Sequence, residues 1–87
     1  MKELGRKLKA CRELTDVTQL DISALCNFST TQYVSNVERG IGKPSPLLIK
    51  AYAYVTNTDI SKLVTWMLEY EGRILLSKLK KIKLKGK

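Results

Sequence analysis

Two amide side chains, Gln32 and Asn36, have the residue types and the spacing for paired hydrogen-bonding chemistry. They are four positions apart, and the apolar residues Val34 and Val37 beside them have the i, i+3 spacing of a short helix with one inward face. With the valines inward, both amides lie on the outer face. Gln and Asn can each form two hydrogen bonds to the major-groove edge of adenine, so this face could recognise bases.

The amino-acid composition excludes several kinds of catalytic and metal-binding site. The 87 residues include no histidine, which excludes imidazole-dependent catalysis and histidine-ligated zinc. Cys11 and Cys26 alone cannot complete a structural zinc site, and both fall at apolar-periodic positions. We therefore expect reduced core thiols in a cytoplasmic protein, with no metal, no cofactor and no enzymatic activity.

The net charge of +8 points to a polyanionic partner, but it is unevenly distributed. Residues 1–72 hold nine basic and eight acidic side chains, whereas residues 73–87 hold seven basic and no acidic ones. We expect one folded domain over residues 1–72 and a basic C-terminal extension over residues 73–87. The basic residues of the extension are Arg73, Lys78, Lys80, Lys81, Lys83, Lys85 and Lys87.

Helical periodicity and capping residues predict five short helices. They span Lys2–Leu14, Thr18–Cys26, about Thr31–Arg39, a segment from Pro46 to the terminating Asn57, and a segment capped by Asp59. Thr18 is the expected N-cap of the second helix, and Asn27 and Gly40 are the expected left-handed residues after the second and third helices. The expected inward residues are Leu4, Leu8, Cys11, Ile22, Leu25, Cys26, Val34, Val37, Ile49, Tyr52, Ala53, Thr56, Ile60, Leu63, Val64 and Met67.

The tail permits two structures. Leu75, Leu79 and Ile82 fit a helix, whereas the alternation from Lys81 to Lys85 fits a strand. This basic amphipathic segment could extend a dimer, contact phosphates or lie on a membrane surface. A membrane surface is the weakest of these, because the rest of the chain gives it no support. No run of 18 apolar residues exists, so the sequence predicts no membrane-spanning segment.

A string of residues at fixed offsets is more specific than the helix pattern. It comprises Leu4-Gly5-Arg6-Lys7-Leu8, Arg12, Val17-Thr18-Gln19, Ile22-Ser23, Val34-Ser35-Asn36-Val37-Glu38-Arg39-Gly40, Pro44-Ser45, Ile49, Ala53 and residues 59–63. Over residues 4–64 the chain thereby resembles the Cro and phage-repressor type of helix-turn-helix domain, the XRE family. It departs from that pattern at Cys26, at Asn27, and by one additional residue that we place near Phe28-Ser29.

The resemblance implies an all-α, five-helix lambda-repressor-like fold, here with an extended C-terminal helix and a basic tail. It implies a structural ion pair between Arg12 and Glu38, and a small Ser23 where the second and third helices cross. The candidate base-reading residues are Thr31, Gln32, Tyr33, Ser35 and Asn36. The candidate phosphate-contacting residues are Thr18, Gln19, Thr30, Arg39 and Lys43.

The resemblance also implies a small phage or bacterial transcriptional repressor that binds a palindromic double-stranded DNA operator as a homodimer. We expect a dimerisation segment near residues 63–76, with Trp66, Met67, Tyr70 and Ile74 in the contact. Two alternatives stay open. One is an antitoxin-like or adaptor module that binds a protein partner through the segment Trp66–Leu84, and the weaker one is RNA binding.

Overall fold

The computed structural model describes residues 2–85 and contains five α-helices with no strand in that range. They are α1 (Lys2–Leu14), α2 (Gln19–Leu25), α3 (Gln32–Glu38), α4 (Pro46–Thr56) and α5 (Ile60–Lys81). The predicted all-α, five-helix fold is therefore confirmed. Lys87 of the predicted extension lies outside the described residues.

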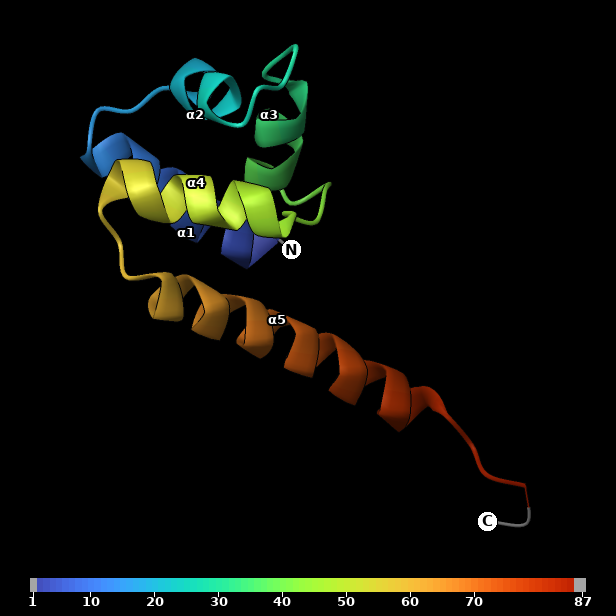
Figure 1. Ribbon diagram of the computed structural model, residues 1–87. Helices are drawn as coiled ribbons and strands as arrows, with labels where there is room; N and C mark the ends of the chain where they lie inside the picture. The colour runs from blue at the N-terminus through green and yellow to red at the C-terminus, as the bar shows by residue number, and fades with distance from the viewer. Residues whose placement is uncertain (1, 86–87) are drawn as a thin grey trace.

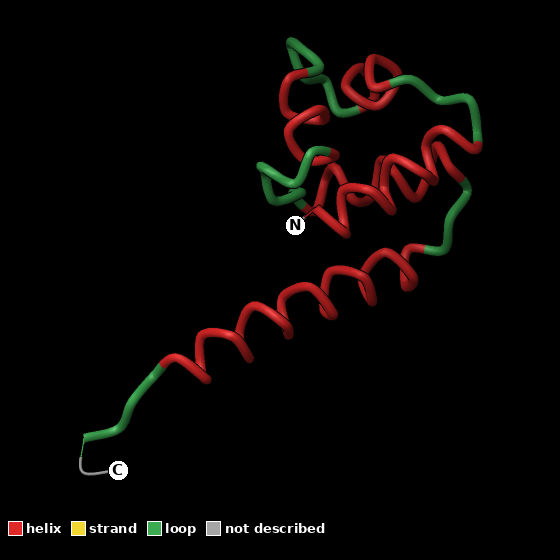
Figure 2. Tube along the Cα trace, turned by 180° about the vertical axis from the view of Figure 1, so that it is seen from behind, coloured by secondary structure: helices red, strands yellow, loops and turns green. Residues whose placement is uncertain are grey.

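The helices form layers around one core (Figure 1). α1 and α4 pack against each other; α2 and α3 lie on one side of this pair and α5 on the other, as the reverse view also shows (Figure 2). The fully buried side chains at the centre come from all five helices: Leu8, Ile22, Ser23, Val34, Val37, Leu48, Tyr52 and Leu63. None of the helices in residues 2–85 has both the length and the apolar character needed to cross a membrane.

Local capping chemistry sets the helix ends. Thr18 Oγ1 accepts a hydrogen bond from the Asp21 amide at 3.0 Å, and the Asp21 carboxylate accepts one from the Thr18 amide at 2.9 Å. This reciprocal pair satisfies backbone donors that the first turn of α2 would leave free. Asn27 and Gly40 follow α2 and α3 with φ values of 61° and 80°, which is the left-handed conformation predicted for both.

Several residues predicted to face inward are more exposed than expected. Leu25, Ile60 and Val64 are 48%, 47% and 44% exposed, and Cys11 is only partly buried. The helices that carry Leu25, Ile60 and Val64 have little surface in contact with the rest of the chain: α2 has only two turns, and α5 packs on α1 and α4 from one side. In α5 the fully buried residue is Leu63, while Ile60 and Val64 lie at the edge of the contact.

α5 continues well past the folded body. It runs as one helix to Lys81, so the helical interpretation is right for Leu75 and Leu79. It is wrong for Ile82, which follows the helix with an extended backbone, and the strand interpretation of residues 81–85 is also wrong. The predicted boundary between residues 72 and 73 falls inside this helix. Every residue from Glu71 to Lys85 is exposed. Glu71 and Arg73 still contact the body, through Lys43 at 2.7 Å and Glu3 of α1 at 3.2 Å, and the chain beyond them projects away from the other helices (Figures 1 and 2).

Candidate nucleic-acid interface

α2 and α3 form two short helices joined by a six-residue turn. Ile22 from α2 and Val34 and Val37 from α3 are buried together and fix the angle between the helices. Ser23 is 1% exposed, in agreement with the small residue expected at the crossing, and its carbonyl accepts a hydrogen bond from the Phe28 amide at 2.9 Å. The turn is thus tied back to α2, which holds α3 in a defined position.

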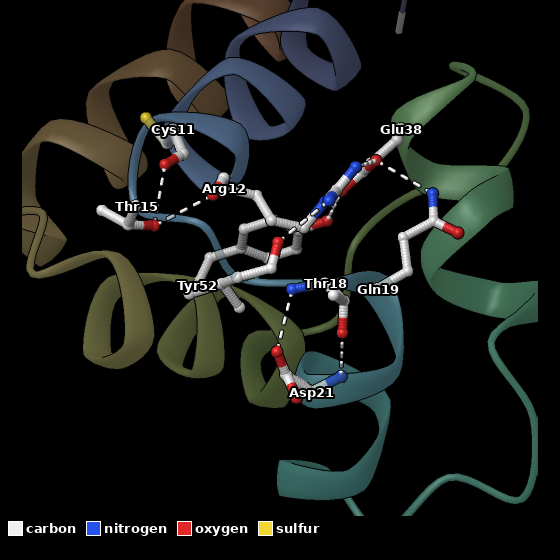
Figure 3. Close-up of polar contacts among 9 residues, drawn as sticks. Cys11, Arg12, Thr15, Thr18, Gln19, Asp21, Glu38 and Tyr52 are labelled. Carbon is white, nitrogen blue, oxygen red and sulfur yellow. Dashed lines mark hydrogen bonds and ion pairs between the residues drawn. The ribbon is translucent and has the colours of Figure 1, made fainter.

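The carboxylate of Glu38, at the end of α3, is held by side chains from three other helices (Figure 3). Arg12 of α1 forms the expected ion pair with two hydrogen bonds, Nε to Oε2 at 2.7 Å and Nη2 to Oε1 at 3.0 Å. Gln19 Nε2 of α2 donates to Oε1 at 3.0 Å, and the hydroxyl of Tyr52 of α4 donates to Oε2 at 2.5 Å. We call these four residues the Glu38 cluster.

The electrostatics of the Glu38 cluster keep it charged and paired. Burial alone would raise the pKa of Glu38, but hydrogen bonds from Arg12, Tyr52 and Gln19 together lower it below its ordinary value. Burial, together with the hydrogen bond to the carboxylate, raises the pKa of Tyr52, which therefore remains a donor. The hydrogen bond to Glu38 raises the pKa of Arg12 despite its burial. The cluster consequently joins α1, α2, α3 and α4 through one ionised carboxylate.

Two glycines hold the C-terminal end of α3 against α1. A Cβ built on Gly5 would lie 2.6 Å from the carbonyl oxygen of Val37, and closer still to that of Glu38. A Cβ on Gly40 would lie 2.7 Å from the Cα of Lys2, at a φ that already favours glycine. A larger residue at either glycine would therefore force the backbones of α1 and α3 apart.

The outer face of α3 carries a hydrogen-bonded row of polar side chains. Gln32 Nε2 donates to Asn36 Oδ1 at 2.8 Å, and Arg39 Nη2 donates to the same oxygen at 2.7 Å. Among the contacts of residues 2–85, none uses the amide oxygen of Gln32 or the amide NH₂ of Asn36. The row therefore presents one acceptor and one donor, the pair of groups that adenine N6 and N7 require.

The residues before and beside this row have mixed roles. Thr30 Oγ1 accepts a hydrogen bond from the Gln32 amide at 3.2 Å, whereas the N-cap residue Thr31 makes no side-chain capping bond. Ser35 and Thr31 are partly buried at the side of the helix. Thr30 therefore stabilises the first turn of α3, whereas the side chain of Thr31 makes no capping hydrogen bond there.

Tyr33 stabilises the loop after α3. Its hydroxyl donates to the Lys43 carbonyl at 2.6 Å and accepts from the Ser45 amide at 2.8 Å, and its ring packs edge-to-face on Phe28 with centroids 5.5 Å apart. Lys43 Nζ in turn lies 2.7 Å from Glu71 Oε1 of α5. The side-chain polar groups of Gln19, Tyr33 and Lys43, which were predicted to contact DNA, thus contact other elements of the same chain.

A metal centre has no residues to support it in the described part of the chain. Residues 2–85 contain no group of three or more Cys, Asp and Glu side chains placed to hold a metal ion.

The sequence match agrees with this geometry. Residues 8–63, well over half of the chain, match the helix-turn-helix family, and the match extends from α1 to the buried Leu63 of α5. The chain belongs to the helix-turn-helix family. It is a DNA-binding regulator of the XRE type, in which α2 and α3 are the helix pair. A search of curated proteins finds no match to the chain.

The helix-turn-helix domain uses part of the expected dimerisation segment for its own core. Trp66 and Met67 pack against the buried cluster of the same chain, and the ammonium groups of Lys7 and Lys62 lie 5.3 and 5.6 Å from the centroid of the Trp66 ring. Ile74 is 39% exposed and lines a shallow pocket together with Lys43 and Tyr70. The most exposed apolar side chains of α5 are instead Leu68, Leu75, Leu76 and Leu79, at 54% to 63%.

Several residues that hold the helix-turn-helix together were not identified from the sequence. Tyr52 was expected only to pack, yet its hydroxyl completes the Glu38 cluster. A buried tyrosine needs a partner for its hydroxyl, which was the available signal. Gly5 belongs to the matching string, but its close approach to α3 is visible only in three dimensions. Leu48 and Ala51 of α4 are further core residues outside the predicted set.

Proposed function

We propose that this regulator is a small repressor that binds a palindromic double-stranded DNA operator as a homodimer. The observation that carries the proposal is the polar row on the outer face of α3, anchored by the Glu38 cluster at the end of the same helix. A helix fixed at its end and polar on its outer face can enter the major groove without rearranging. α3 has no acidic residue on that face, because its only carboxylate is the buried Glu38.

In this proposal Gln32 and Asn36 read bases, and an adenine is the preferred partner for their free acceptor and donor. Thr31 and Ser35, at the sides of the row, make smaller contacts such as that of a threonine methyl with the thymine methyl. Tyr33 contributes through its ring and through the loop it stabilises, since its hydroxyl is already bonded to Lys43 and Ser45.

Phosphate contacts orient the domain on the duplex without reading its sequence. We assign them to Thr18, Thr30 and Arg39, which are exposed around the α2–α3 unit. Gln19 and Lys43 contact phosphates only if their side chains also reach beyond, or leave, their present partners Glu38 and Glu71. The regulator binds as a homodimer, because a single module binds DNA weakly. As a phage or bacterial protein in the cytoplasm, it then represses by occupying a two-fold symmetric site at a promoter.

The polar row is tested by substituting its two amides singly. Gln32→Ala and Asn36→Ala should each weaken binding to the cognate site by about 1–3 kcal/mol, with little effect on binding to random DNA. Fluorescence anisotropy with both DNAs at one salt concentration measures the difference. Ser61→Ala, an exposed polar change at the start of α5, is the control and should leave both affinities unchanged.

Equal losses on cognate and random DNA would show that the row contacts only the backbone, and the proposed reading face would be wrong. A loss caused by Ser61→Ala of the same size would show that the assay responds to stability and not to recognition.

One observation favours a second function, an antitoxin-like or adaptor module. Leu75, Leu76 and Leu79 on the projecting part of α5 are 57%, 55% and 54% exposed, and apolar side chains in such a group mark an interaction site. A neighbouring gene that encodes a short toxin, and co-purification of its product with this chain, would distinguish that function from operator binding alone.

A further inference from the structure

One side of α5 is apolar along the part that leaves the body. Leu68, Leu75 and Leu79 follow one another at seven and four positions, which places them on one helix face. They are 63%, 57% and 54% exposed. This face, which we call the α5 stripe, differs from the side that carries Leu63 and Met67 into the core.

Gly72 lies in the middle of the α5 stripe, four positions after Leu68 and three before Leu75. A Cβ built on Gly72 meets no atom of residues 2–85 within 4 Å, in contrast to Gly5. Glycine inside a helix lowers helix stability, and nothing within the described chain accounts for it here. A missing side chain at this position lets the backbone of another helix approach closely.

The stripe continues into a groove on the body. An open cavity of about 440 Å³ is lined by Pro44, Pro46, Ile60, Val64 and Leu68, among others. Its apolar walls are the N-terminal end of α4 and the first half of α5. An apolar side chain of another helix packed beside Leu68 would reach this groove.

Charge is sorted along the same helix. The half of α5 next to the body carries Glu69 and Glu71, and residues 73–85 carry basic side chains and no acidic ones. Glu71 and Lys78, seven positions apart, line one shallow pocket on the edge of the stripe with Leu75 between them. A second helix of opposite charge order would therefore match this one along its length.

We infer that the occupant of the α5 stripe is α5 of a second copy of this chain, packed antiparallel about a two-fold axis between Gly72 and Leu75. Gly72 then faces the partner's Leu75, and Leu68 faces the partner's Leu79, so the two glycines lie at the closest approach. The partner's Leu79, and the partner's Ile82 directly after the end of its α5, reach the groove beside Val64. Glu71 lies near the partner's Lys78, and the symmetry makes this pair twice.

Parallel pairing lacks these matches, because it places the basic ends of both helices side by side. The inference deepens the homodimer of the proposed function and rests on it. It moves the contact from the Trp66 and Met67 side, which the monomer core uses, to the opposite part of α5.

Sedimentation equilibrium of the full chain tests the stripe. The wild-type chain should be a dimer, and Leu75→Glu or Gly72→Gln should raise the dimer Kd by about tenfold or more, since each places a bulky polar group at the centre. Leu14→Glu changes a leucine that is 86% exposed on α1 and should leave Kd unchanged. Circular dichroism of each variant shows whether it is folded.

A charge exchange tests the antiparallel order. Glu71→Lys and Lys78→Glu should each weaken the dimer, because each opposes like charges across the axis, and the double variant should restore it. The intramolecular contact of Glu71 with Lys43 does not explain such a rescue, since the double variant lacks it. Absence of rescue would overturn the antiparallel arrangement.

Three further results would overturn the inference: a wild-type chain that stays monomeric, one that instead binds anionic phospholipid vesicles, and one that dimerises equally well with Leu75→Glu. Fluorescence anisotropy of the same variants with DNA that contains a single half-site distinguishes failure of the α5 contact from failure of base reading by α3. Half-site binding that persists in Leu75→Glu shows that the reading face works without the dimer contact.

Discussion

Glu38 makes more connections between elements than any other side chain described above. Its carboxylate is 2% exposed and accepts hydrogen bonds from residues of three other helices. A buried ion pair contributes little net stability compared with apolar packing, but loss of one member leaves the other charge buried without compensation. The stability of the α2–α3 unit therefore depends on this one carboxylate.

Glu38→Gln should lower the free energy of unfolding by about 3–5 kcal/mol, because the guanidinium of Arg12 loses its anion while remaining largely buried. Chemical denaturation followed by circular dichroism measures the change. Glu13→Gln, an exposed carboxylate of α1, is the matched control and should change stability by less than about 0.5 kcal/mol. Similar losses in both variants would mean that the cluster has no special role.

The stability difference between wild type and Glu38→Gln should depend on pH. The pKa of Glu38 is lower in the folded state than its ordinary value of 4.5, so its contribution is complete above that pH. As the pH falls below 4.5 toward the folded-state pKa, the contribution is lost. The stability difference between wild type and Glu38→Gln should therefore be constant near neutral pH and shrink on acidification. A difference that grows in acid would contradict the assigned sign.

Prediction from sequence was uneven at the scale of single residues. The pairing of Arg12 with Glu38 could be inferred because both belong to a string with fixed spacing. The additional donors, Gln19 and Tyr52, could not, because each comes from another helix and its partner depends on how the helices cross. Tyr33 was assigned to the reading face by its position on α3, yet its hydroxyl reaches ten residues along the chain to the loop.

At the scale of elements, the two helical glycines should respond in opposite ways to the same substitution. Gly5→Ala should destabilise the protein by about 1–3 kcal/mol, because its Cβ would meet backbone atoms of α3 that cannot move freely. Gly72→Ala should stabilise it by about 0.5–1 kcal/mol, because alanine favours the helix and the site is open.

Thermal or chemical unfolding at a protein concentration that keeps the chain monomeric measures both glycine variants. Each glycine serves as the control for the other, since both gain the same methyl group within a helix. A stabilising effect of Gly5→Ala would show that α1 and α3 are not in close contact.

Helix ends were more predictable than helix faces. Thr18, Asn27, Ser45 and Asn57 act within a few residues of themselves, and each occupies the cap position that its local sequence indicates. Which residues of α5 are exposed depends instead on how far α1 and α4 extend along that helix. Leu75 and Leu79 have a helical period whether or not a partner is present, so periodicity alone could not show that the chain leaves them free.

At the scale of the whole molecule, net charge and sequence recognition are carried by different parts. The first 72 residues are almost neutral and contain the polar row of α3, while the described basic side chains of the extension lie on or after the far half of α5. α5 packs on the side of the α1–α4 layer opposite α2 (Figure 1). Composition therefore indicated the class of partner through residues that lie apart from the proposed reading face.

In the proposed function, α3 reads the base sequence of double-stranded DNA as part of a symmetric dimer. Selection of bound sequences from a random pool of duplex DNA tests it most directly. We expect the wild-type chain to enrich one two-fold symmetric motif, and Gln32→Ala or Asn36→Ala to lose that enrichment. A pool that stays random after repeated selection with the wild-type chain, while DNA is still retained, would contradict it.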